Sequence, residues 1–286
     1  MNREEIGVFL FRFYRKRTTS FLANIYKASI TGESKDIHRA RLDVKKIFAL
    51  YGLFEMVAPS AFKHQGGYKL FRPLYRQAGK IREIQVNYLL LNAQQPPDAD
   101  YTSFVLWLRD EERRAIYKYL QLVKKFRESE LTDTEKLIQK ICHSSSIFKL
   151  RSKTEAYIKS KAAIVKDLQL SEPGDKEIHK IRQQLKSMST IATLVYSIKP
   201  GKHLDLLVTS FNKTEMMIGD WHDRVVLKEA IERFLSGNTL DLTESSAELN
   251  SLNLLKQGLI DYNLNLVQHF MPEVNGIVEA ILTKES

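Results

Sequence analysis

IHRARLDVKK, residues 37–46, and IHKIRQQLK, residues 178–186, are two copies of one pattern whose histidines are 141 residues apart. Each copy contains a histidine, an arginine three residues later and a lysine seven residues later. At 100° per residue these positions lie within about 60° of one another on an α-helix, so each copy predicts a helix with one basic face. The apolar residues of both segments fall mostly on the opposite side, where they would pack into a core.

A second landmark follows each histidine at almost the same distance. Gly79, in the segment AGKIREI, lies 41 residues after His38, and Gly219, in the segment IGDWHDR, lies 40 residues after His179. Two landmarks kept nearly in register indicate an internal repeat. We therefore predict a single domain over residues 1–286, with repeat one at about residues 1–130 and repeat two at about 131–286.

The chain is predicted to be all-α. It has few glycines and prolines, long stretches of apolar residues with a period of 3.6, and no succession of alternating strands bounded by hairpin turns. The periodicity predicts four helices in each repeat, with the last one broken near Pro272. Their expected ranges are 3–30, 35–57, 67–94, 100–129, 133–170, 175–198, 203–236 and 243–284.

The charge of the chain indicates an anionic partner. The formal net charge is +10, and residues 38–93 and 179–219 together carry +11, so the rest of the chain is nearly neutral. The single cysteine, Cys142, excludes an internal disulfide, and we expect it to be buried and unreactive. The apolar stretch at residues 6–11 is too short for a signal peptide or a membrane span, so we expect a cytoplasmic protein without membrane insertion.

The third helix of repeat one adds a second basic stripe at offsets 0, 3, 7 and 11, formed by Lys69, Arg72, Arg76 and Lys80. Two basic faces on neighbouring helices would form a groove. Repeat two lacks the same stripe, and Lys199, Lys202 and Lys213 are the candidates to replace it. Repeat one is therefore expected to contribute more of the binding energy.

The two histidine helices and the glycine landmarks resemble the CHAD family, the conserved-histidine α-helical domain, across essentially the whole chain. Its motif, His-x-x-Arg-x-x-x-Lys/Arg-Lys/Arg, is matched by His38, Arg41, Lys45 and Lys46, and in the second copy by His179, Arg182 and Lys186. The segment at residues 79–83 is similar to the family's Gly-x-x-Arg-Asp, with glutamate in place of aspartate. Phe48, Ser187 and Ser189 stand where further basic residues are common in the family.

The resemblance implies two four-helix bundles related by pseudo-twofold symmetry, with a basic groove or pore that binds inorganic polyphosphate without catalysis. We expect no cofactor and no metal, and polyphosphate granules are a candidate location. The residues expected to bind polyphosphate are His38, Arg41, Lys45, Lys46, Lys69, Arg72, Arg76, Lys80, His179, Arg182, Lys186, Lys202 and Lys213. The sequence leaves the oligomeric state and the preferred chain length open.

Two alternatives remain at this stage. The same basic groove would attract the phosphodiester backbone of a nucleic acid, although no zinc-finger spacing, RNP-like strand or helix-turn-helix signature is visible. A metal-dependent phosphohydrolase is the contrasting class, because His179 together with His222 and Asp223 could supply metal ligands. His222 and Asp223 align with Arg82 and Glu83 of repeat one, which favours a structural landmark.

Overall fold

The computed structural model describes residues 3–62, 67–94, 99–144, 150–170, 173–198, 201–237 and 247–283. These residues form ten α-helices and no strand, which confirms the all-α fold. None of the helices in the described ranges is both long and apolar enough to span a membrane. The helices are α1 (Arg3–Thr31), α2 (Ser34–Val57), α3 (Pro59–Phe62), α4 (Gly67–Gln94), α5 (Thr102–Lys124), α6 (Ser129–Cys142), α7 (Leu150–Leu168), α8 (Asp175–Ile198), α9 (Lys202–Gly237) and α10 (Ala247–Leu282).

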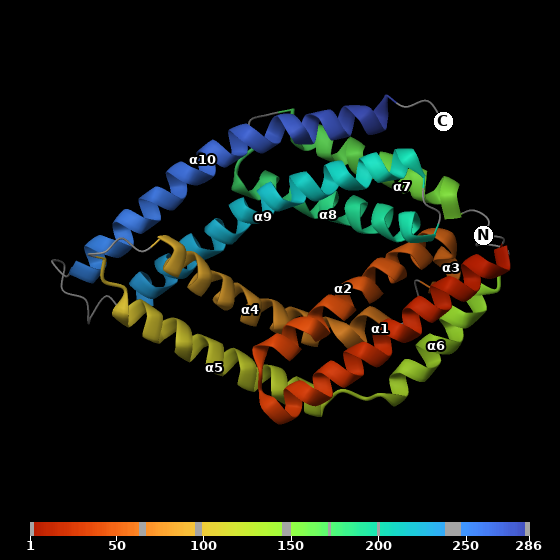
Figure 1. Cartoon of the computed structure of the whole chain (residues 1–286), viewed down its shortest axis with the longest axis horizontal. Coiled ribbons are helices and arrows are strands. Elements are labelled where there is room, and N and C mark those ends of the chain that lie inside the picture. The colour runs from red at the N-terminus through yellow and green to blue at the C-terminus, as the bar shows by residue number, and fades with distance from the viewer. Residues whose placement is uncertain are drawn as a thin grey trace.

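The helices form two bundles that lie against each other (Figure 1). In the first bundle α1 packs on α2, α2 on α4 and α4 on α5, and in the second α7 packs on α8, α8 on α9 and α9 on α10. The first helix of each bundle also contacts the last. The order of packing is thus the same in both bundles, as an internal repeat requires, while the pseudo-twofold symmetry itself stays a prediction.

Most predicted helices are confirmed, including those at residues 67–94 and 175–198, but four details are wrong. The helix expected over residues 100–129 is α5, which already ends at Lys124, and α6 begins at Ser129. The helix expected over residues 133–170 is two helices, α6 and α7, because α6 packs beside α1 and its apolar residues join the core of the first bundle. The short helix α3 was not predicted. The division into repeats near residue 130 stays a prediction.

The expected break near Pro272 is also wrong, because α10 continues through this residue. A proline inside a helix removes one backbone hydrogen bond and disturbs the preceding turn. Here the residues on both sides of it, Phe270 and Val274, are fully buried in the core of the second bundle. Their packing holds the helix together across the proline.

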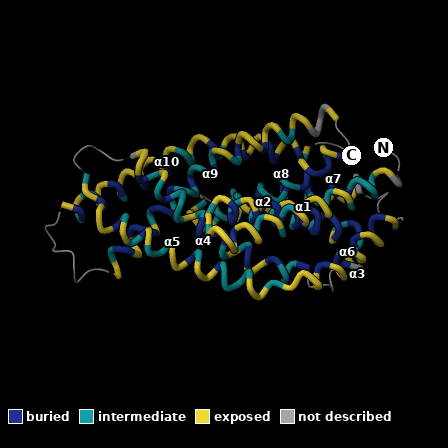
Figure 2. The backbone as a smooth tube through the Cα atoms, turned by 60° about the horizontal axis from the view of Figure 1, so that its bottom comes forward, coloured by how far each residue is buried: buried dark blue, intermediate teal, exposed yellow. Residues whose placement is uncertain are grey.

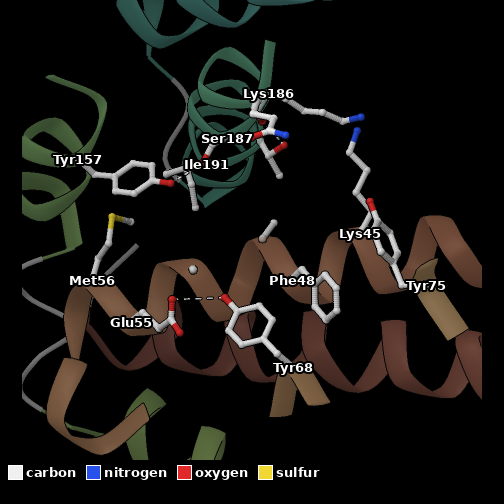
Figure 3. A pocket seen from close by; sticks show the side chains of 14 residues that line it. Lys45, Phe48, Glu55, Met56, Tyr68, Tyr75, Tyr157, Lys186, Ser187 and Ile191 are labelled. Atoms are coloured by element: carbon white, nitrogen blue, oxygen red, sulfur yellow. Dashed lines mark hydrogen bonds between the residues drawn. The ribbon is translucent and has the colours of Figure 1, made fainter. Parts of the chain in front are cut away.

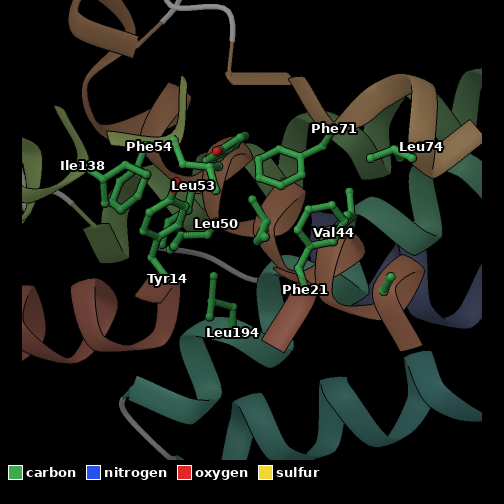
Figure 4. Packing of buried hydrophobic residues seen from close by; sticks show 14 of the residues in the cluster. Tyr14, Phe21, Val44, Leu50, Leu53, Phe54, Phe71, Leu74, Ile138 and Leu194 are labelled. Carbon is green, nitrogen blue, oxygen red and sulfur yellow. The ribbon is translucent and has the colours of Figure 1, made fainter. Parts of the chain in front are cut away.

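Apolar packing joins the two bundles at two places. Leu194 and Val195, in the second half of α8, belong to the large core of the first bundle, and Figure 4 shows Leu194 pointing into it. A separate cluster joins α4 and α5 to α9 and α10 through residues such as Phe104 and Phe234. Figure 2 shows that the buried positions recur along the inward sides of the helices. The contact between the bundles is therefore partly a continuous core.

Asp43, in the first histidine helix, fastens α2 to α1. Its side chain is almost completely buried and accepts hydrogen bonds from three residues of α1: Arg17 Nη1 at 3.2 Å, Ser20 Oγ at 2.6 Å and Asn24 Nδ2 at 3.1 Å. A buried carboxylate with three donors is satisfied, whereas its removal leaves those donors without an acceptor.

Replacing Asp43 by alanine is expected to lower the free energy of unfolding by about 2–4 kcal/mol, because the Arg17 guanidinium would remain half-buried without its counter-ion. Urea denaturation followed by circular dichroism measures this change. The same substitution at the exposed Asp167 of α7 is the control and should alter stability by less than about 0.5 kcal/mol. Equal effects of the two substitutions would show that Asp43 does not fasten the helices.

Candidate anion-binding site

The two histidine helices meet where the bundles meet, because α2 contacts both α7 and α8. Figure 3 shows the side chains of Lys45, from α2, and Lys186, from α8, extending toward each other. Arg41 and Arg182 lie close enough to Lys186 to affect its charge. We call Arg41, Lys45, Arg182 and Lys186 the cationic cluster. Each bundle contributes one arginine and one lysine to it.

The pKa of Lys186 shows most clearly how closely these cations lie together. Burial lowers the pKa of its ammonium group to about 8, and the positive charges of Arg182 and Lys45 act in the same direction. Burial also lowers the pKa of Arg182. Like charges that are drawn together and removed from water favour any anion that can lie between them. In the isolated protein, the positive charges of the cluster therefore repel one another, and a bound anion would relieve this repulsion.

Arg41 is held by α4. Its guanidinium group lies 4.2 Å from the ring centre of Tyr75, and its Nη1 donates a hydrogen bond to the backbone oxygen of that residue at 3.2 Å. A Cβ atom at Gly79 would lie 3.6 Å from Arg41 Nη1, which is an ordinary van der Waals contact, so the guanidinium group packs beside this glycine. A Cβ atom at Gly219 would meet nothing within 4 Å, so no side chain packs beside the second glycine landmark in this way.

Three half-buried histidines surround the cluster. Burial lowers the pKa of His38, with Arg82 and Arg41 contributing, and it lowers the pKa of His179, with Arg182 contributing. Burial, Arg182 and His179 together lower the pKa of His222 to about 3. All three imidazoles are therefore neutral near pH 7 and can donate one N–H each. The Nδ1 atom of His38 is buried and has no hydrogen-bond partner among the described residues.

Carboxylates partly balance the cations. Burial raises the pKa of Asp223 on α9, while Arg182 and Arg82 lower it, so this carboxylate lies among cations of both bundles. The negative charge of Glu215, also on α9, opposes the lowering of the pKa of Arg182 and of Lys186. Burial likewise raises the pKa of Glu83 on α4, against the opposing effect of Arg41.

His179 and His222, the two histidines that the phosphohydrolase alternative needs as metal ligands, lie in contact with each other. The rings of His179 and His222 are 5.5 Å apart between centres. Within the described ranges, however, no group of three or more His, Cys, Asp or Glu side chains is placed to hold a metal ion. Cys142 is buried as expected, and burial raises the pKa of its thiol to about 12, so it stays protonated.

The structure does not bring all the predicted residues together. Lys46 is exposed and lies near Arg17 and Lys16, on the α1 side of α2. Lys213 is exposed and its Nζ is 2.7 Å from Glu273 Oε1 on α10, so its charge is already paired. Lys199 and the side chain of Lys202 lie outside the described residues. The basic stripe of α4 is exposed throughout, as four residues: Lys69, Arg72, Arg76 and Lys80.

The structure adds four residues that the sequence analysis did not place among the polyphosphate-binding residues: Tyr75, Arg82, His222 and Asp223. Of these, His222 and Asp223 entered the sequence analysis only as candidate metal ligands, and Arg82 only as part of the first glycine landmark. All four lie within one helical turn of Gly79 or Gly219. The glycine landmarks therefore mark the segments of α4 and α9 that face the histidine helices, and their positions are the sequence signal for these four residues.

Lys186 is expected to make stability and anion binding depend on pH in opposite directions. Below about pH 8 it is charged in both the folded and the unfolded protein, and the folded protein holds an unfavourable charge. Between about pH 8 and the ordinary lysine pKa of about 10.4, the folded protein loses this proton first. The free energy of unfolding should rise over that window while affinity for a polyanion falls.

Urea midpoints and polyphosphate affinity measured from about pH 7 to about pH 9.5 test this expectation. The variant Lys186→Met should remove both trends while leaving the helix content unchanged. An affinity that stays constant over this range, or the same trends in the variant, would exclude Lys186 as their origin.

The geometry defines a class of protein: two packed helical bundles with a cationic cluster between their matching helices. The family model described as "CHAD domain" matches residues 14–232, and the chain belongs to this family. A crystal structure of the CHAD domain from the plant Ricinus communis is similar, with a TM-score of 0.64 and 13% sequence identity over 99% of this chain and 92% of that one. No curated protein sequence shows significant similarity to this chain.

Proposed function

We propose that this protein binds inorganic polyphosphate at the cationic cluster and does so without catalysis. The observation that carries the proposal is the convergence of Arg41 and Lys45 with Arg182 and Lys186 between the two bundles. Burial, together with these neighbouring cations, lowers the pKa of Lys186 to about 8. A chain of phosphates supplies closely spaced negative charges that several cations can share. The three neutral histidines add N–H donors beside them.

The path of the chain beyond the cluster is part of the proposal. Lys80 and Arg41 both oppose the rise in the pKa of Glu83, so the exposed α4 stripe comes close to the cationic cluster at Lys80. A phosphate chain that leaves the cluster along α4 would find further cations on its surface. Repeat one would then contribute the larger share of the contacts.

A nucleic acid backbone is the competing ligand, since its phosphates would be attracted by the same cations. The aromatic rings of α4 that are closest to the basic residues, Tyr68 and Tyr75, pack against Phe48 at 5.0 and 5.3 Å. Both rings line one recess and do not form an exposed row along which successive bases could stack. This arrangement favours a phosphate chain over a single-stranded nucleic acid.

The test is binding of long-chain polyphosphate to the purified protein over a series of salt concentrations, with single-stranded RNA and double-stranded DNA as competitors. We expect tight binding whose logarithm falls linearly with the logarithm of salt concentration, because counterions are released. Nucleic acids should displace the polyphosphate poorly at equal phosphate concentration. Equal competition by nucleic acid would favour the backbone-binding alternative, and absence of binding would contradict both.

A further inference from the structure

A hollow of about 490 Å³ lies beside the cationic cluster, between α2 and α4 of the first bundle and α7 and α8 of the second. Lys45 and Lys186 stand at one end of it, and Glu55, Met56 and Tyr157 at the other (Figure 3). Its volume falls within the usual range of small-molecule sites, which is about 300–1,000 Å³. The hollow is therefore large enough for a ligand that also reaches the cluster.

Aromatic rings form much of its wall. Phe48, Tyr68 and Tyr75 come from the first bundle and Tyr157 from the second. Phe48 is 5.0 Å from Tyr68 and 5.3 Å from Tyr75 between ring centres, and Tyr75 is also in contact with Arg41 of the cluster. A flat apolar group placed here would contact aromatic faces and edges on more than one side.

Small residues on α2 create the space. Ala49 and Gly52 lie on the side of α2 that faces α8 across the hollow. A Cβ atom added at Gly52 would meet only Ile191 Cδ1, at 3.9 Å, which is an ordinary contact. The glycine is thus not required by the helix or by close packing, and a larger side chain there would occupy the hollow.

The polar groups of the hollow are unevenly placed. Two ammonium groups lie at the end next to the cluster, whereas the Glu55 carboxylate lies at the far end, where it accepts a hydrogen bond from the Tyr68 hydroxyl at 3.4 Å. Lys45 and Glu55 are ten residues apart on one helix, which corresponds to about 15 Å. A matching ligand is anionic at one end, aromatic in the middle and a hydrogen-bond donor at the other end.

We propose that this hollow binds the base of a purine nucleoside triphosphate while the phosphates lie on Lys45 and Lys186. The base packs among the aromatic rings, and its amino or ring N–H groups donate to Glu55. This inference rests on the proposed anion-binding function, because the two lysines belong to both sites. It adds a discrimination that phosphate binding alone does not provide, namely a preference for phosphates that carry a base.

The test compares GTP and ATP with inorganic tripolyphosphate by isothermal titration calorimetry, without divalent metal. These ligands share the phosphate chain and differ in the nucleoside. We expect the purine nucleotides to bind at least about ten-fold more tightly than tripolyphosphate, as one stacked base provides. CTP, with its smaller ring, should lie between them.

Two variants separate the hollow from the cluster. Gly52→Leu fills the hollow and is expected to reduce nucleotide affinity to that of tripolyphosphate, while tripolyphosphate affinity changes by less than about two-fold. Glu55→Ala, at an exposed side chain, should cost the purines about ten-fold without affecting tripolyphosphate. Gly258→Leu on α10 is the matched control, because a Cβ atom there would meet nothing within 4 Å and this position lies outside the hollow.

The outcomes distinguish the two proposals. Tripolyphosphate binding with no advantage for nucleotides would overturn the base site and leave the anion-binding proposal standing. A nucleotide advantage that survives both Gly52→Leu and Glu55→Ala would place the base elsewhere and also overturn this inference. If neither tripolyphosphate nor nucleotide binds while long-chain polyphosphate does, the base site is overturned and the anion-binding function stands. If long-chain polyphosphate also fails to bind, both proposals fail.

Discussion

Replacing Lys45 and Lys186 together by glutamate is expected to weaken polyphosphate binding by about 100- to 10,000-fold. Each lysine is expected to lose a charge-assisted hydrogen bond, which contributes about 1.5–3 kcal/mol, and each new carboxylate repels the ligand. The slope of the salt dependence should also become shallower by about 0.7–0.9 for each phosphate contact that is lost. Affinity measured over a salt series gives both quantities at once.

The fold should tolerate this double substitution. Lys45 and Lys186 are half-buried among Arg41 and Arg182, so glutamates would replace repulsion between cations by attraction. Circular dichroism and the urea midpoint check that the helices remain. The control is the pair Lys140→Glu and Lys256→Glu, which makes the same change of net charge on α6 and α10, away from the cluster. An equal loss of affinity in the control would show that net charge, and not the cluster, drives binding.

Replacing Trp221 by alanine is expected to lower the free energy of unfolding by about 3–5 kcal/mol. The indole ring is 1% exposed and belongs to the core of the second bundle together with Phe211 and Ile218. Its removal leaves a cavity that the surrounding helices fill only in part. Urea denaturation monitored by circular dichroism measures the loss.

Trp107, the other of the two tryptophans in the chain, provides the comparison. It is only half-buried and packs against the apolar residues that join α5 to α9. Its replacement by alanine should cost about 1–2 kcal/mol, in proportion to the smaller buried area. A loss below about 1 kcal/mol for Trp221→Ala would mean that the second core repacks around the cavity. Trp221 also precedes His222 and Asp223, so a disturbed α9 should weaken polyphosphate binding as well.

The depressed pKa of Lys186 links stability to binding. The isolated protein holds a buried cation near other cations, which disfavours the folded state near pH 7. The same charge is available to an anion at no further cost of desolvating the lysine. Lys186 therefore lowers the stability of the folded protein at the site where we propose that the ligand binds. Such a trade-off between stability and function is common at functional sites.

Much of the fold was accessible from sequence because it depends on local periodicity. The 3.6-residue pattern and the positions of proline and glycine gave the bounds of α2, α4, α8 and α9 to within two residues. The end of α6 was missed because residues 143–146 contain no glycine or proline. Continuity of α10 through Pro272 depends on the packing of Phe270 and Val274, which no local pattern reports.

The sequence alone determined which residues share a helical face, since helical geometry fixes that from spacing. It thereby gave the pairs Arg41 with Lys45 and Arg182 with Lys186. Only the tertiary structure decided that the two pairs meet, that Lys213 is paired with Glu273, and that Lys46 faces α1. The reason is physical: the approach of α2 to α8 is set by apolar packing between residues far apart in the chain, and charges follow the helices that carry them.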